Sequence, residues 1–453
     1  MEVVEAVLEK LVEAGVGKGL SEVEAYSVES SILSLTVSSN KVKEASRSRI
    51  VTTGLRGAIG RRVGGLALTA LNVDPVEVAG ELARIAGAAP EDPYWPGFPT
   101  PLHGTSRALC LDKRIAELSE EEAVEILLNA MEAMRSAAIS MHVDEAVVVE
   151  GSLNMGSQRY RVVNSHGVDA DAECTFISLW LTLSVKTSRG SSDKSVFTVR
   201  RGLDEQYLME RSREAGELAP LFAGARPVES GVYDVILTPE SAGLILSTLL
   251  TPAFSALNIL ESRSPLKGKV GEEVVSPVLT ITDDPTLPLE TGSRGFDDEG
   301  VGTRMKVILD KGVFKQPLHS YYTASRMGDE PTGNGFRRVP GSPTQPGATN
   351  MVVQPVRGSL EDFTREAGRA LVVYEMIGYW MSNPVNGVVK ATVSHGLLVE
   401  KGEVVKPVKG VVITGNIYEW LGRGLIGVGS DLRINNGVGS PSIWVSRVNV
   451  AGE

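Results

Sequence analysis

The feature that most constrains the fold is a pattern that occurs twice in the first half of the chain. A helical pattern over residues 3–14 is followed by strand-like runs and by a second helical pattern over 75–86. The order returns after a proline-rich loop at 90–101: a helix over 120–138, strand-like runs, and a closing helix over 204–219. This order predicts two similar units in which helices cover one face of an antiparallel sheet. The predicted strands are 23–28, 32–37, 50–55, 58–62, 143–150, 159–164, 174–185 and 196–200.

The second half has a different composition. From Gly231 onward it is rich in glycine, proline and short β-type runs, with predicted helices over 240–250 and 360–377. We therefore predict an α+β fold. Its domains are an N-terminal α+β unit, a second α+β unit and a C-terminal β-rich domain, with limits at 1–100, 101–225 and 226–453.

One long segment of the second half is predicted to be irregular. Residues 330–350 combine several prolines and glycines, a composition that cannot form regular structure over that length. Long irregular segments of compact domains often carry function. We therefore place the binding surface of this half near that loop.

The overall charge argues against nucleic-acid binding. The net charge is −11, whereas sequence-independent DNA binding needs clustered lysine and arginine. A local group of arginines alternates with apolar residues, so we interpret it as a solvated sheet face. Its members are Arg47, Arg49, Arg56, Arg61 and Arg62.

The sequence also predicts the cellular setting. Glutamates stand in the N-terminal segment where a signal peptide would have a basic region and an unbroken apolar run. The uncharged stretch 242–260 contains serine, threonine, asparagine and proline, which makes it a poor membrane span. Cys110 and Cys174 match no metal-ligand spacing. We expect a cytoplasmic protein with reduced cysteines that does not bind membranes.

The chain lacks the pattern of a zinc hydrolase. That pattern needs two histidines on one helix face with a glutamate after the first. No histidine here is followed by glutamate and no two lie close in sequence, so no HExxH motif is present. The five histidines are His103, His142, His166, His319 and His395.

A group of carboxylates in the second half allows two interpretations. Five of them in a short span are able to bind Ca²⁺ or Mg²⁺ through oxygen ligands. They are equally suited to cap turns, because one pair precedes Pro285 and another belongs to the turn-like run DDEG. We favour the structural role and keep metal binding open. The group is Asp283, Asp284, Asp297, Asp298 and Glu299.

Several phrases of the second half resemble the TldD/PmbA family, historically called modulators of DNA gyrase. They occur in the family's order and cover most of residues 295–442. The first half resembles the family in layout more than in letters. The phrases are GFDDEGVGTRMKVILDKGVFKQPLHSYYTASRMG, PTGNGFRR, NPVNG, LLVEKGEVVKPVKGVVITGN and VGSDLRINNGVGSPS.

The resemblance implies which of the two kinds of member this chain is. The TldD kind resembles a metallopeptidase with an HExxxH helix and a further cysteine ligand near the C-terminus. By the resemblance, the metal positions fall here on Ser247, Thr248 and Pro252, none of which is a normal zinc ligand. The C-terminal phrase also lacks the cysteine. The chain therefore resembles the TldE/PmbA kind, with no catalytic residue and no metal ligand of its own.

The resemblance further implies a function. We expect a non-catalytic subunit of a two-component zinc metallopeptidase that acts on small unfolded peptides held extended in a groove. A TldD-like partner would carry the zinc, this chain would bind no cofactor and be inactive alone, and in isolation it would form a homodimer. The apolar segments 371–381 and 417–429 are the predicted interface. The predicted substrate or interface residues are Thr332, Gly333, Asn334, Gly335, Arg337 and Asn386.

Two alternatives remain open at this point. One is a self-associating module that binds peptides or proteins and takes no part in hydrolysis. The other is an independent hydrolase that uses the acidic group and a different metal.

Overall fold

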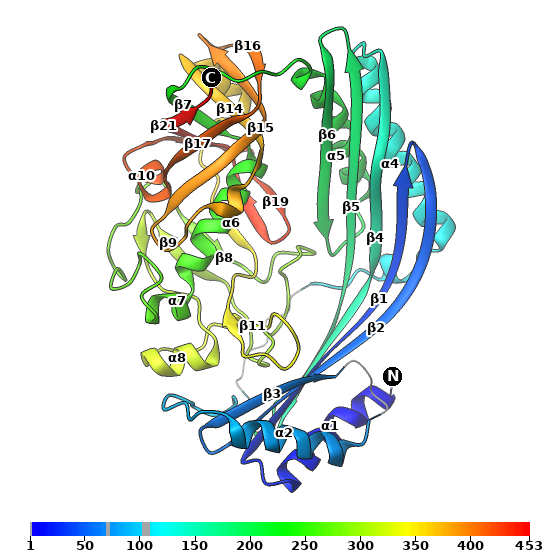
Figure 1. The fold of residues 1–453 in the computed structure, drawn as a ribbon, viewed down its shortest axis with the longest axis vertical. Coiled ribbons are helices and arrows are strands. Elements are labelled where there is room, and N and C mark those ends of the chain that lie inside the picture. Colours follow the sequence, from blue (N-terminus) through cyan, green and yellow to red (C-terminus); the bar gives the residue numbers. More distant parts are fainter. Residues whose placement is uncertain (1, 69–72, 102–108) are drawn as a thin grey trace.

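The structure is a computed structural model that describes residues 2–68, 73–101 and 109–453. In Figure 1 a long, curved sheet runs along one side of the molecule and a β-rich body lies beside it. Helices α4 and α5 lie along the upper part of the long sheet, and α1 and α2 lie at its lower end (Figure 1). Among the described residues, no helix combines the length and the apolar character needed to cross a membrane.

The N-terminal half contains the predicted repeat. Helix, three strands and helix occur twice, as α1-β1-β2-β3-α2 and as α4-β4-β5-β6-α5. The elements are α1 (Glu2–Gly17), β1 (Glu22–Ser38), β2 (Lys41–Ile59), β3 (Arg62–Leu68), α2 (Pro75–Ala88), α3 (Lys113–Glu117), α4 (Glu120–Ser140), β4 (Glu145–Asn164), β5 (Asp169–Thr187), β6 (Gly190–Arg200), α5 (Glu205–Leu218) and η1 (Ala219–Phe222).

The two units share one sheet. Its strand order is β3-β2-β1-β4-β5-β6, and all neighbours are antiparallel. The junction is the long β1–β4 pairing, which runs from Glu24 opposite Asn164 to Ser38 opposite Glu150. The predicted α+β class is therefore confirmed, whereas the proposed domain limits stay a prediction.

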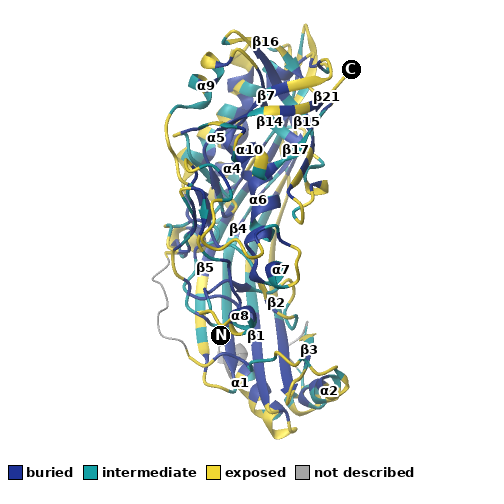
Figure 2. Cartoon of the chain, turned by 90° about the vertical axis from the view of Figure 1, so that its left-hand side faces the viewer, coloured by how far each residue is buried: buried dark blue, intermediate teal, exposed yellow. Residues whose placement is uncertain are grey.

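Strand β1 contributes side chains to three separate hydrophobic clusters, two on one face of the sheet and one on the other. Its odd-numbered residues Val23 and Ala25 pack under α1 and α2, and Leu33 and Leu35 pack under α4. The even-numbered Tyr26 belongs to a separate cluster with Phe296 of the C-terminal half. Because side chains alternate along a strand, one face of β1 meets helices and the other face meets the β-rich body. The buried part of β2 near α2 and β3 is dark blue in Figure 2.

The C-terminal half is rich in short strands. Its elements are β7 (Gly231–Leu237), α6 (Pro239–Phe254), α7 (Ala256–Leu260), β8 (Ile281–Asp283), β9 (Lys306–Asp310), β10 (Val313–Phe314), α8 (Tyr321–Met327), β11 (Gly335–Phe336), β12 (Gln345–Pro346), β13 (Met351–Val353), α9 (Leu360–Glu366), β14 (Arg369–Ile377), η2 (Tyr379–Met381), β15 (Val388–Glu400), β16 (Glu403–Val408), β17 (Val411–Asn416), α10 (Ile417–Leu421), β18 (Leu425–Val428), β19 (Arg433–Asn435), β20 (Val438–Ser440) and β21 (Ile443–Ala451).

Two sheets organise this half around α6. Strands β14, β7, β21, β17 and β15 follow one another, and β14 also pairs with β15, so they close into a barrel. The second sheet has the order β10-β9-β8-β13-β20-β19. Buried residues of α6, such as Ile245 and Leu249, share one core with the barrel's Val373 and the second sheet's Ile281 and Ile308.

One predicted helix is wrong. Residues 360–377 divide into helix α9 and strand β14. Strand β14 lies between a parallel neighbour, β7, and an antiparallel neighbour, β15. A strand buried on both faces reads as an apolar run without alternation, which periodicity alone does not separate from a buried helix. The helix predicted over 240–250 is confirmed; it spans Pro239–Phe254, with Pro252 within its last turn.

The expectation of reduced cysteines is also wrong. Cys110 and Cys174 form a disulfide across 64 residues of sequence. The backbone brings them together, since the amide of Thr175 donates to the carbonyl of Cys110 at 2.8 Å. A disulfide is unusual in a reducing compartment, so the expected cytoplasmic location stays a prediction.

Candidate functional site

The irregular loop 330–350 is held by the acidic group, which lies beneath it. Asp297 is fully buried and accepts hydrogen bonds from the amides of Gly335 at 2.7 Å and Val301 at 3.0 Å. Burial raises the pKa of Asp297 well above its usual value, and the nearby Glu299 raises it further. Asp298 accepts from the amide of Arg337 at 2.8 Å. Asp297 caps its own turn through the amides of Glu299 and Val301, as the structural interpretation predicts. Asp297 and Asp298 also hold the loop, which the sequence did not predict.

Another buried carboxylate of the acidic group, Asp283, holds the centre of the loop. Asp283 forms an ion pair with Lys306 Nζ at 3.0 Å, and both side chains are almost fully buried. Asp283 also accepts from Asn334 Nδ2 at 2.8 Å and from the amide of Thr349 at 2.6 Å. Burial lowers the pKa of Lys306 despite this partner. The network pins the loop to strands β8 and β9.

The predicted site residues of this loop therefore lie inside the protein. Thr332 is buried and exchanges hydrogen bonds with the backbone of His319. Gly333 has a positive φ of 70°, and a Cβ there would lie 2.5 Å from the carbonyl of Gly302. A Cβ at Gly335 would lie 2.2 Å from a Glu299 oxygen, so both glycines are required by close packing. A role of the loop toward substrate stays a prediction.

Arg337 joins the loop to the N-terminal sheet. Its guanidinium pairs with Glu24 of β1, and both side chains are 1% exposed. Tyr26, two residues further along β1, donates to Asp298 at 2.8 Å. The same face of β1 thus holds the β-rich half in place. Asn386 lies elsewhere: its carbonyl accepts from Asn416 of β17 at 2.8 Å.

Helix α6 carries the three positions that the family resemblance assigns to the metal. The hydroxyls of Ser247 and Thr248 both donate to the carbonyl of Leu244, at 3.0 and 2.7 Å. Pro252 lies inside the helix, and its carbonyl accepts from Asn258 Nδ2 at 2.8 Å. All three are partly exposed. Each hydroxyl donates back to a carbonyl about one turn earlier in its own helix, and serine, threonine and proline side chains are not normal zinc ligands.

The four histidines within the described part of the chain do not gather at one site. His319 is buried beside Asp329 at 3.4 Å, and burial lowers its pKa. His166 lies in the turn between β4 and β5, and His142 follows α4, whereas His103 falls outside the described residues. Among residues 7–68, 73–101 and 109–453, no three His, Cys, Asp or Glu side chains are grouped to hold a metal ion.

A charged network that the sequence did not predict joins the long sheet to the barrel. Glu375 of β14 pairs with Lys194 of β6 and lies 2.8 Å from His395 Nδ1 of β15. Burial favours the neutral acid, but His395 and Lys194 outweigh it and lower the pKa of Glu375 to about 2. Lys194 and His395 lie 181 and 20 residues from Glu375 in the sequence, so no local sequence pattern predicts this network.

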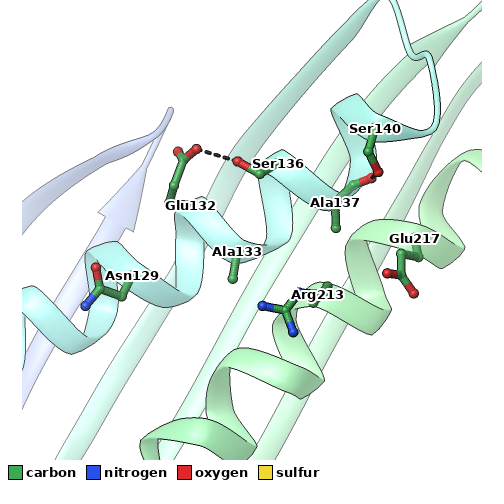
Figure 3. A pocket seen from close by; sticks show the side chains of 8 residues that line it. All are labelled: Asn129, Glu132, Ala133, Ser136, Ala137, Ser140, Arg213 and Glu217. Atoms are coloured by element: carbon green, nitrogen blue, oxygen red, sulfur yellow. Dashed lines mark hydrogen bonds between the residues drawn. The ribbon is translucent and has the colours of Figure 1, made fainter.

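One surface hollow offers little chemistry. A hollow of about 390 Å³ lies between α4 and α5, where Ala133 points toward Arg213 (Figure 3). Glu132 is occupied by Ser136, whose hydroxyl donates to it at 2.5 Å. Small side chains and one such pair give no convergent set of reactive groups.

Two domain profiles of one protein family match the chain. The profile of the PmbA/TldA metallopeptidase C-terminal domain matches residues 230–452, and that of the central domain matches 113–220. An uncharacterised protein of Methanocaldococcus jannaschii is 30% identical over 310 residues, which are 68% of this chain and 69% of that protein.

Two solved structures are similar over nearly the whole chain. TldE of Thermococcus kodakarensis has a TM-score of 0.87 at 28% identity and covers 98% of this chain and 100% of its own. A Thermotoga maritima protein described as a putative modulator of a DNA gyrase has a TM-score of 0.85 at 25% identity, with 99% and 100% covered.

Proposed function

The chain belongs to the TldD/PmbA family, and we propose that it is the TldE-type subunit of a two-component zinc metallopeptidase. In this proposal a TldD-like partner carries the zinc and cleaves small unfolded peptides. This chain binds no metal, has no catalytic residue and completes the substrate chamber.

The observation that carries the proposal is the chemistry of α6. An HExxxH helix would place histidine, glutamate and histidine at the positions of Ser247, Thr248 and Pro252. The hydroxyls of Ser247 and Thr248 donate to the carbonyl of Leu244 in the same helix, and neither residue type is a normal zinc ligand. Proline has no side-chain donor atom at all. The similarity to TldE of Thermococcus kodakarensis supports the same assignment.

The surface supports pairing with another subunit. The predicted interface segment 371–381 starts in the barrel core, where Leu371 and Val373 are buried, but ends in an exposed apolar turn. Trp380 and Met381 are 64% and 65% exposed. Aromatic residues and methionine are enriched where subunits meet. Segment 417–429 is less suited, because Trp420 is buried in the barrel core.

Zinc analysis tests the proposal. This chain and its TldD-like counterpart are purified separately, dialysed against the same buffer and examined by elemental analysis. We expect about one zinc per chain for the counterpart and far less than one for this chain, because a structural or catalytic zinc needs three or four nitrogen, sulfur or carboxylate ligands. About one dialysis-resistant zinc in this chain would refute the proposal and favour an independent hydrolase.

A further inference from the structure

A cavity separates the two halves of the molecule near the lower end of the long sheet. Its volume is about 490 Å³, within the range of small-molecule sites. One wall is formed by the β2–β3 hairpin and the loop 90–99. The opposite wall is formed by α8 and residues 341–345.

Arg56 of β2 is the cation of this cavity and corrects a prediction from the sequence. The other arginines of its group, Arg47, Arg49, Arg61 and Arg62, are exposed as predicted. The side chain of Arg56 is only 7% exposed. The difference follows from register: Arg56 lies directly opposite Glu24 across the β1–β2 ladder, on the sheet face that the C-terminal half covers.

The donors of Arg56 are unusually free for a buried group. Its Nη1 lies 3.6 Å from Glu24, which is too long for a hydrogen bond. The guanidinium packs over the rings of Trp95 and Phe98, at 5.3 and 5.2 Å from their centroids. No described residue accepts a hydrogen bond from it, although guanidinium has five N–H donors. The buried Arg337, by contrast, pairs with Glu24 and also donates to the carbonyl of Asp298.

The rest of the cavity is fixed in advance. Glu22 accepts from Trp95 Nε1 at 2.5 Å and from the amide of Phe98 at 2.8 Å, so the aromatic wall has a set position. On the other side, Glu299 accepts from Thr344 at 2.5 Å and from the amide of Tyr321 at 2.7 Å. Both acids already have partners, whereas the guanidinium offers unused donors.

We propose that this cavity binds a small ligand through a carboxylate group, which the guanidinium of Arg56 receives, with an apolar or aromatic group of the ligand packed against Trp95 and Tyr321. A planar carboxylate matches the fork of a guanidinium. A doubly charged phosphate fits less well, because the carboxylates of Glu24, Glu299 and Glu22 also act electrostatically on Arg56, and their repulsion grows with the charge of the ligand. The proposal does not depend on the peptidase role.

The carboxylate has two possible sources: the C-terminus of a short peptide or a free organic acid. The probes separate them. Binding of N-acetyl-L-phenylalanine, N-acetyl-L-alanyl-L-phenylalanine and 3-phenylpropanoate to the full chain is measured by titration calorimetry. N-acetyl-L-phenylalaninamide has the same shape as the first probe but no charge, so it reports what the carboxylate contributes.

We expect the acids to bind and the amide to bind at least about tenfold more weakly, because a charge-assisted pair is lost. Binding of all the acids points to any apolar carboxylate, and binding of the peptide-derived acids alone points to a peptide C-terminus; either supports the proposal. Equal binding of acid and amide, or no binding of any acid at millimolar concentration, would overturn it.

Variants locate the interaction. Arg56→Gln should weaken acid binding by about tenfold or more, whereas Arg61→Gln, the same charge change on the exposed turn nearby, should leave it unchanged. Val63→Trp places a large side chain in the cavity without altering any charge and should also abolish binding. It keeps the proposal testable if Arg56→Gln does not fold. Acid binding that survives Val63→Trp would place the ligand elsewhere.

Discussion

The buried ion pair between Asp283 and Lys306 gives the sharpest test of how the loop 330–350 is held. Lys306→Met removes the charge and keeps an unbranched side chain of similar length. Asp283 would then remain 0% exposed, with only the neutral donors of Asn334 and Thr349 around it. A buried carboxylate without a cation is strongly destabilising, since breaking such a pair costs about 3–5 kcal/mol.

The expected magnitude depends on the partners that remain. Asn334 and Thr349 still donate to Asp283, so we expect the lower end of that range, about 3 kcal/mol. Adding Asp283→Asn removes the stranded charge. The double variant should therefore lose less than the sum of the two single variants, by about 1–3 kcal/mol.

Hydrogen exchange at the amides of residues 332–353 is the suitable assay. It reports the free energy of local opening, and so it does not require that a chain with several sheets unfold in one step. Lys315→Met on the same β9–β10 hairpin is the matched control: Lys315 is 47% exposed, and its pair with Asp310 spans 3.7 Å. It should cost less than about 0.5 kcal/mol. If Lys306→Met differs from this control by less than about 1 kcal/mol, the loop is not anchored as described.

Three further predictions test other contacts. A Cβ at Gly54 would lie 1.8 Å from the backbone nitrogen of Gly341, so Gly54→Ala should destabilise the protein by about 1–3 kcal/mol in urea unfolding. Gly80 of helix α2 has open space around it, so Gly80→Ala should instead stabilise the protein by up to about 1 kcal/mol. The pKa of Glu375 is lowered to about 2. Its charge therefore stabilises the folded protein fully above the unfolded pKa of about 4.3, and this contribution is lost as pH falls toward 2. The urea midpoints of wild type and Glu375→Gln should converge over that pH range; a constant difference would contradict this. Light scattering should give about twice the chain mass of 48.3 kDa, and Trp380→Ser should shift the protein toward monomer; a wild-type monomer at micromolar concentration would exclude the homodimer.

The sequence predicts the elements better than their connections. The helix–strands–helix repeat was visible because α1, α2, α4 and α5 have clear apolar periodicity. Strand β1 was predicted as two strands, since the polar Glu29, Ser30 and Ser31 interrupt its apolar pattern at the point where it passes from one core to the next. That both units share one sheet depends on the β1–β4 register, which no local pattern specifies.

The candidate site shows the same limit. The glycine- and carboxylate-rich segments were selected from the sequence as a candidate site, which stays a prediction. The sequence did not show that their side chains face inward, because Asn334 and Arg337 each bind a carboxylate more than 50 residues away. Arg56 looked like its exposed neighbours, and only the pairing with Glu24 separates it from them. The disulfide depends on backbone proximity in space, which cysteine spacing does not give.

The most direct measurement of the central claim is a peptidase assay on the reconstituted pair. This chain, its TldD-like counterpart and an equimolar mixture are each examined by size-exclusion chromatography and by hydrolysis of an unfolded peptide. We predict that the two chains elute together, that the mixture is active, and that this chain alone is inactive even with added zinc. Hydrolysis by this chain alone, or a mixture that neither elutes together nor exceeds the counterpart's own activity, would contradict the account.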